Sequence, residues 1–184
     1  MVPRLKNIYK KEIIPQLSKS LGIKNSMKIP KIQKVVLHMG LGREGNDNKI
    51  IKVIEKDMSN ITGQKPVVTL SKKSISNFKT RVKMPLGLKV TLRRDNMYFF
   101  LDRLINMALP RIKDFKGLNP KSFDQNANYS FGIKEHVVFP EVNFDKVEKI
   151  RGLDITIVTN TSNQAEAKAL LDGFNFPFYK KGAN

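Results

Sequence analysis

The chain contains no cysteine and no tryptophan, and only two histidines. Without cysteine it can form no disulfide, no thiolate nucleophile and no Cys-ligated zinc or iron–sulfur site, and it suits a reducing compartment. His38 and His136 are too few to build a zinc site by themselves, and neither stands in an H-E-x-x-H pattern. The sequence therefore predicts no metal and no cofactor.

Long apolar runs are also missing. The longest have four or five residues, such as residues 155–158, whereas a bilayer span needs about 18. The N-terminal residues include Pro3, Glu12 and Pro15 and lack the apolar core and cleavage site of a secretory signal. We therefore expect no membrane partner.

Acidic residues are few, with 16 Asp and Glu against 34 Lys and Arg, so the formal net charge is +18. Residues 58–94 hold nine basic residues and no acid, and residues 1–34 hold nine against Glu12 alone. Residues 35–57 and 95–184 carry net charges of 0 and +1. Such segregation favours a surface that binds a polyanion, although evenly solvated lysines remain the alternative.

Hydrophobic residues make up 40% of the chain, which is too much for a disordered polycation. The length predicts one domain over residues 1–184 that buries roughly 70% of its unfolded surface. Within it we expect a basic N-terminal helix in residues 1–30, a basic projecting loop over residues 71–84 and a frayed tail over residues 179–184.

Hydrophobic periodicity predicts the individual elements. Helical spacing predicts helices over residues 4–22, 48–61, from Asp95 or Asn96 to Leu109, and over 163–171, the last with a capping box of Asn163 and Glu166. Alternation predicts strands over residues 31–40, 66–70, 86–93, 128–133 and 153–159. This order favours an α+β fold with a mixed or antiparallel sheet, helices on one face and an exposed polar, basic face.

The same alternation assigns side chains to the two faces of the sheet. The apolar positions of the third predicted strand, Leu86, Leu88, Val90 and Leu92, should point inward. Gly87 should point outward, where it would leave room for the close approach of a sugar-phosphate backbone.

One motif suggests an enzyme instead. Gly40, Gly42 and Gly45 match G-x-G-x-x-G between a predicted strand and a predicted helix. The acidic residue expected about 20 positions later to bind the ribose is absent. A dinucleotide-binding enzyme therefore stays only as the alternative.

Among nucleic-acid binders, structured RNA is favoured. Phe78 is the only aromatic residue within 58–94, so base stacking on the sheet is not expected to dominate. Contacts should go to phosphates, 2′-hydroxyls and RNA shape. DNA remains open on electrostatics alone, without a helix-turn-helix or zinc-finger pattern.

Several blocks of the sequence closely resemble the bacterial-type "L five" family of large-subunit ribosomal proteins. The blocks are TGQKP (62–66), KKSISNFKTR (72–81), MPLGLKVTLR (84–93), FLDRLINMALPRIKDFKGLNPKSF (100–123), NYSFGIKE (128–135) and VVFPE (137–141). The resemblance implies a non-catalytic structural protein that binds 5S rRNA and helps attach it to the large rRNA in the central protuberance. It places the chain on a cytoplasmic ribosome, with an organellar ribosome as the alternative.

The resemblance also implies site residues. Gln64 and Thr91 correspond to a 5S-binding polar cluster, whose third member is usually Asn where this chain has His38. Cations of the exposed polar, basic face of the sheet are added to this cluster. The expected 5S rRNA-binding set is then Lys34, His38, Gln64, Lys65, Lys89, Thr91 and Arg93. For Gln64, a simple role in ending a helix is the alternative.

The basic loop is the part that in the family reaches the P-site tRNA. The expected contact set is Lys72, Lys73, Ser74, Phe78, Lys79, Arg81 and Lys83. For Ser74, Ile75 and Phe78, packing within the loop itself is the alternative. Residues 110–145 are similar to the region that bridges to a small-subunit head protein, although the family's usual D-G-R-G-N-Y reads DQNANY at residues 124–129. No small-molecule substrate is expected.

Overall fold

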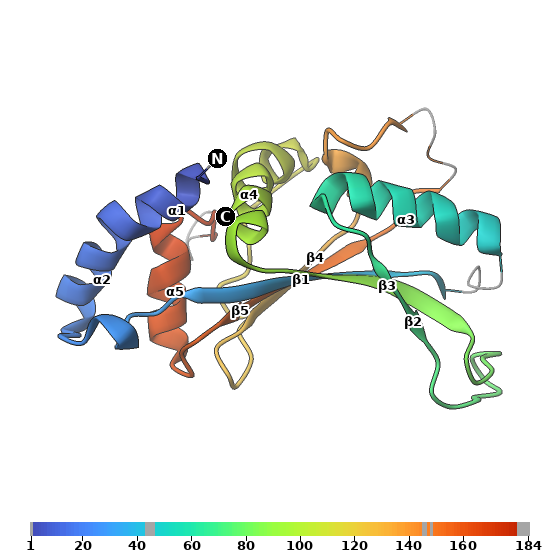
Figure 1. Ribbon diagram of the computed structural model, residues 1–184, viewed down its shortest axis with the longest axis horizontal. Coiled ribbons are helices and arrows are strands. Elements are labelled where there is room, and N and C mark those ends of the chain that lie inside the picture. The colour runs from blue at the N-terminus through green and yellow to red at the C-terminus, as the bar shows by residue number, and fades with distance from the viewer. Residues whose placement is uncertain (1, 43–46, 145–146, 148, 180–184) are drawn as a thin grey trace. The chain divides into compact units, whose positions relative to one another are not determined.

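The computed structural model describes residues 2–42, 47–144, 147 and 149–179 (Figure 1). It contains a five-stranded sheet with the order β2-β3-β1-β5-β4. The strands are β1 (Ile32–Gly40), β2 (Val67–Leu70), β3 (Pro85–Leu92), β4 (Tyr129–Ile133) and β5 (Leu153–Thr159). Every predicted strand is present to within one residue at either end, and the α+β fold class is confirmed.

The α-helices are α1 (Arg4–Ile8), α2 (Ile14–Leu21), α3 (Asn48–Thr62), α4 (Arg94–Arg103) and α5 (Gln164–Gly173). Shorter turns of π-helix (Tyr9–Ile13 and Leu104–Ala108) and of 3₁₀-helix (Ser26–Lys28, Leu109–Arg111 and His136–Val138) extend or connect them.

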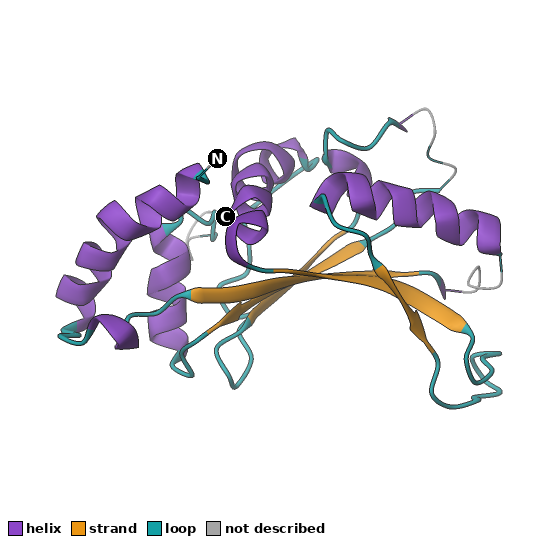
Figure 2. Cartoon of the chain, viewed as in Figure 1, coloured by secondary structure: helices purple, strands orange, loops and turns teal. Residues whose placement is uncertain are grey.

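The contacts of the chain divide it into two compact units. The first unit comprises Met1–Val35, Arg93–Phe131 and Thr156–Asn184, and the second comprises Val36–Leu92 and Gly132–Ile155. A single domain over residues 1–184 stays a prediction. In the second unit the described helices lie on one side of the strands, as Figure 2 shows.

In the first unit, the N-terminal helix is one continuous helical run with a π turn immediately before Pro15. Proline lacks an N–H group and its ring crowds the carbonyl four residues earlier, so a widened turn accommodates it. Gly22, in the left-handed region with φ 64°, ends the helix as expected. The helix stops at Leu21, so residues 1–30 are helical only in part.

The start of α4 differs from the prediction. The N-cap is Arg93, in extended conformation and without a side-chain cap, so neither Asp95 nor Asn96 caps this helix. Asp95 instead accepts a hydrogen bond from Lys6 Nζ at 2.5 Å. The Asp95 carboxylate, which the local sequence predicted to cap α4, therefore binds the Lys6 side chain of α1 instead.

The C-terminal part of the first unit follows the prediction more closely. Asn163 caps α5 by accepting from Ala165 N at 3.0 Å, while Glu166 accepts from the Thr161 hydroxyl at 2.6 Å. Tyr179, expected to be frayed, donates its backbone N–H to Leu118 O at 3.1 Å. The rest of the predicted tail, residues 180–184, lies outside the described residues.

In the second unit, α3 buries one stripe of residues against the sheet. Asp47 caps its start by accepting from Lys49 N, and Gly63 ends it with φ 68°. The buried stripe is Ile51, Ile54, Met58 and Ile61. It packs on the inward-facing positions of β1 and β3, and no helix among the described residues covers the opposite face of these strands (Figure 2).

Candidate nucleic-acid interface

The helix-free face of the second unit, called here the open face, is polar. In the antiparallel pair of β2 and β3, Thr69 stands opposite Gly87 and Val67 opposite Lys89, so these positions share one side. Thr69 Oγ1 donates to Gly87 O at 3.0 Å. Alternation along β3 adds Thr91, which is half-buried.

His38 lies directly over Gly87. A Cβ atom placed on Gly87 would meet His38 Nε2 at 2.6 Å, Met39 O at 2.9 Å and Thr69 Oγ1 at 3.3 Å. The expectation that Gly87 leaves room for a sugar-phosphate backbone is therefore wrong, because the imidazole already occupies that space. The absence of a side chain at Gly87 instead leaves room for the His38 imidazole.

A carboxylate extends the same arrangement onto the next strands. Asp154 Oδ2 lies 3.4 Å from His38 Nδ1, and a Cβ on Gly132 would meet Asp154 Oδ1 at 3.3 Å. The imidazole and the carboxylate thus each cover a glycine of the neighbouring strand. Their side chains are 43% and 72% exposed, so solvent weakens this contact and leaves both groups available to a ligand.

Asp154 is the open-face residue that the sequence analysis missed. A negatively charged side chain repels phosphate, so a prediction of phosphate contacts selects cations and passes over Asp154. The signal was nevertheless present, because the buried Leu153, Ile155 and Ile157 force Asp154 onto the opposite side of β5.

Gln64 and Lys65 lie in the turn between α3 and β2. The buried Thr62 hydroxyl donates to Met58 O at 2.7 Å and accepts from Gln64 N at 3.3 Å. Thr62 and Gly63 therefore end the helix, and the exposed Gln64 side chain hydrogen-bonds no other described residue. Lys65 Nζ lies 3.3 Å from Glu55 Oε1, but the lysine is 84% exposed, so this pair is weak.

Of the predicted 5S-binding residues, the structure brings His38 and Lys89 onto one face with Thr91. Lys34 and Arg93 belong to the first unit. There Lys34 is half-buried on β1, and Arg93 is exposed at the start of α4.

The predicted basic loop is confirmed as the connection between β2 and β3. Its base is closed by Ser71 N donating to Met84 O at 2.8 Å and Lys83 N donating to Ser71 O at 2.9 Å. Ile75 and Thr80 form an isolated antiparallel bridge farther out. The loop is therefore an ordered hairpin extension.

The side chains of this loop divide into two roles. Ser74 Oγ accepts from Val82 N at 3.1 Å, so Ser74 stabilises the loop, as the self-packing alternative supposed. The Phe78 side chain is 73% exposed, so it is not buried within the loop. All predicted loop cations are exposed, and among the described residues none forms an ion pair: Lys72, Lys73, Lys79, Arg81 and Lys83.

The glycine motif does not form a phosphate site. The N-terminus of α3, where a pyrophosphate would sit in a dinucleotide fold, is already capped by the Asp47 carboxylate, which accepts from Lys49 N at 2.8 Å. Gly42 has a left-handed backbone with φ 59°, and Gly45 lies outside the described residues.

The part of the chain that the structure describes contains neither a cluster of metal-ligating side chains nor a helix that could span a membrane. There, no three His, Asp or Glu side chains come together in a way that could hold a metal ion. None of the described helices combines the length and apolarity required to cross a membrane.

Comparison with known proteins shows the family of this chain. Residues 25–81 match the family described as ribosomal protein L5, and residues 85–178 match the ribosomal L5P family C-terminus. The chain is 61% identical over 184 residues, the full length of both proteins, to "Large ribosomal subunit protein uL5" of Pelagibacter ubique (strain HTCC1062). The chain belongs to the ribosomal protein L5 family.

A second relative from the L5 family is "Large ribosomal subunit protein uL5" of Dichelobacter nodosus (strain VCS1703A). It is 55% identical over 175 residues, which cover 95% of this chain and 98% of that protein. Membership in the L5 family confirms the resemblance stated from the sequence. It also confirms that the chain is not an enzyme, and the dinucleotide alternative is set aside.

Proposed function

We propose that this protein binds 5S rRNA through its open face and helps attach it to the large rRNA in the central protuberance. Membership in the L5 family makes the chain a structural component of the large ribosomal subunit. The choice of RNA and of surface is our proposal. The observation that carries it is a sheet face without a covering helix, on which His38, Lys89 and Thr91 lie together.

The chemistry of the open face suits a folded RNA. Beside the Asp154 carboxylate and the apolar Val67, it offers hydroxyl, imidazole and ammonium groups, and no aromatic side chain for base stacking lies among its assigned residues. Such groups contact phosphates and 2′-hydroxyls and read the shape of an RNA helix. Gln64 and Lys65 add an amide and a cation in the turn between α3 and β2, and Lys34 and Arg93 supply further phosphate contacts from the first unit.

The loop at residues 71–84 serves a second RNA, which we propose is the P-site tRNA. Its unpaired cations give it an electrostatic attraction that does not depend on the open face. The near-neutral region 110–145 is proposed to contact a small-subunit head protein. There Asp124 Oδ1 accepts from Asn126 N and Asn128 N at 2.9 and 2.7 Å, so the altered loop is held in one shape.

A pair of variants tests this division. Thr91→Glu places a negative charge on the open face and should weaken 5S rRNA binding by at least about tenfold, because like charges across an interface are strongly unfavourable. Thr91→Ser keeps the hydroxyl and is the matched control. Affinity is measured by filter binding with purified protein and 5S rRNA.

The loop is tested by a charge-matched comparison. Replacing Lys72, Lys73 and Lys79 together with Gln should leave 5S rRNA affinity near the parent value and reduce tRNA affinity in assembled ribosomes. The control replaces Lys49, Lys52 and Lys56 with Gln; these lysines are exposed on α3, lie outside every proposed contact and change the net charge equally. Equal losses of 5S rRNA binding from the loop variant and Thr91→Glu contradict the division.

A further inference from the structure

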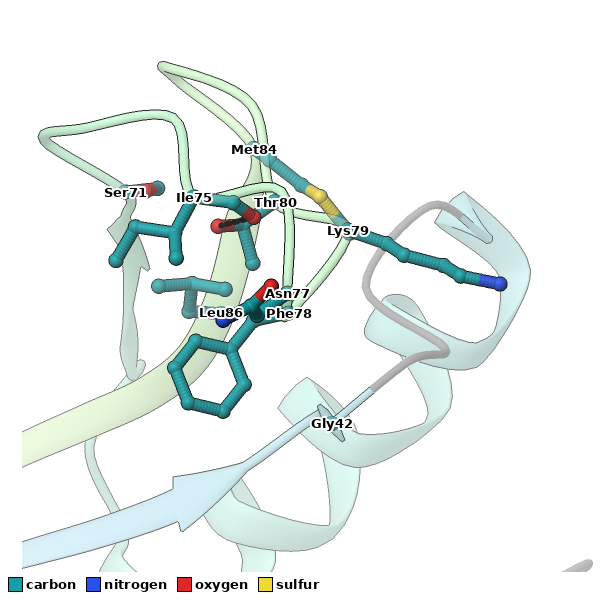
Figure 3. A pocket seen from close by; sticks show the side chains of 9 residues that line it. All are labelled: Gly42, Ser71, Ile75, Asn77, Phe78, Lys79, Thr80, Met84 and Leu86. Carbon is teal, nitrogen blue, oxygen red and sulfur yellow. Dashed lines mark hydrogen bonds between the residues drawn. The ribbon is translucent and has the colours of Figure 1, made fainter.

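We propose that the cavity enclosed by the loop at residues 71–84 receives one unpaired nucleobase of an RNA. This inference rests on the proposed role of the loop as an RNA contact and adds a site to it. The cavity has a volume of about 530 Å³, within the range of pockets that hold small organic groups. Figure 3 shows it between the loop and the end of β3.

Apolar side chains form part of the cavity wall although the loop is strongly basic: Ile75, Phe78, Met84 and Leu86 line it together with the polar Ser71, Asn77, Lys79 and Thr80. Phe78 projects into it beside Leu86, while the Lys79 side chain extends away, as Figure 3 shows. Phe78, Ile75 and Leu86 remain 73%, 46% and 36% exposed. Leu86 was expected to point into the core. Instead it lines this cavity, at the end of β3 where the strand joins the loop.

An exposed aromatic ring in this position suits a base. Bases stack on aromatic side chains irrespective of sequence, because every base has a π face. The Asn77 carboxamide also lines the cavity and hydrogen-bonds no other described residue. An amide has both donor and acceptor atoms, so it can pair with the edge of a stacked base.

Charge complementarity selects a nucleotide over an apolar peptide. Lys79 lines the cavity, and the same loop carries four more exposed cations, Lys72, Lys73, Arg81 and Lys83. None of the five forms an ion pair among the described residues, and residues 58–94 contain no acid. Cations of this kind attract phosphates on either side of the inserted base. The base must be unpaired, because a base inside a duplex offers neither face to a protein ring.

The test uses the absence of tryptophan. In full-length Phe78→Trp protein, the substituted residue is the single tryptophan, so its fluorescence reports on this cavity alone. The protein is titrated to saturation with a short single-stranded RNA and, separately, with the duplex formed from it and its complement. We expect quenching by the single strand and little change with the duplex.

Affinity gives an independent measurement. In a Thr91→Glu background, which weakens the open face, Phe78→Ala should lower single-strand affinity by about 5- to 150-fold, and Phe78→Tyr should retain it. Val82→Ala is the matched control, because Val82 is an exposed apolar loop residue that does not line this cavity. Equal quenching by the two RNAs, no quenching at saturation, or an unchanged affinity of Phe78→Ala overturns the proposal.

Failure of the base site is distinguishable from failure of the loop as an RNA contact. If the Lys72, Lys73 and Lys79 variant loses RNA affinity while Phe78→Ala does not, the loop binds phosphates and the base site is refuted. If the lysine variant binds RNA as tightly as the parent, the proposed role of the loop is refuted with it.

Discussion

Gly87→Ala is the substitution whose effect the structure specifies most closely. The new methyl group would meet His38 Nε2 at 2.6 Å and Met39 O at 2.9 Å. The imidazole can rotate away, but Met39 O is backbone and moves only with β1. We therefore expect Gly87→Ala to expel His38 from its position over β3 and to strain the pairing of β1 with β3.

The magnitude follows from two opposing contributions. Overpacking of this kind costs about 1 to 3 kcal/mol. Replacing glycine lowers the entropy of the unfolded chain and returns about 0.4 to 1 kcal/mol. The net expectation is a loss of about 0.5 to 2 kcal/mol in the free energy of unfolding, or a fall in Tm of roughly 1 to 8 °C for a chain of this size.

The assay is urea denaturation of a double-mutant cycle. Gly87→Ala is measured in the parent and in a His38→Ala background, where the clash with the imidazole is absent and only that with Met39 O remains. The cost of Gly87→Ala should fall by about 1 kcal/mol in the second background, giving a measurable coupling energy. Equal costs in the two backgrounds would refute the packing of His38 on Gly87.

Three further outcomes are expected. Burial raises the pKa of Asp57, and attraction to His136 only partly offsets this. The ionised carboxylate therefore costs stability above its folded pKa, so Asp57→Asn should raise Tm at neutral pH by an amount that vanishes below about pH 4. Hydrogen bonds from Asn128 lower the pKa of Asp124. Asp124→Ala should therefore lower Tm at neutral pH, with a difference that disappears as pH falls through the folded pKa in the same thermal melts. If six to ten phosphates are neutralised, 5S rRNA affinity should fall by about 10³- to 10⁵-fold between about 50 and 200 mM salt; a nearly flat salt response would place the cations away from the interface.

Local patterns were sufficient for most elements. The period-two alternation of β1 and the helical stripe of α3 each follow from a single buried face, and Gly22 and Gly63 mark helix ends because only glycine enters the left-handed region without cost. Asn163 likewise caps α5 from within two residues. These features depend on neighbours in the chain, so the amino-acid order contains the information needed.

Local patterns failed where the partner came from elsewhere. Asp95 was assigned to a cap but binds Lys6, which lies 89 residues away. Leu86 was assigned to the core because it alternates correctly, yet it lies at the exposed end of β3 and lines the loop cavity. For Asp95 a contact distant in sequence set the outcome, and for Leu86 the position at the exposed end of the strand did.

The charge, the fold class and the family follow from the amino-acid order, because charge is additive and the family blocks are contiguous. The arrangement of the open face does not. His38 covers Gly87, and Asp154 reaches His38 across 116 residues of sequence, only because strands β3, β1 and β5 are neighbours in the sheet. The contact between a glycine on one strand and a histidine on the next can be predicted only when strand order and register are known. These depend on the packing of the whole unit.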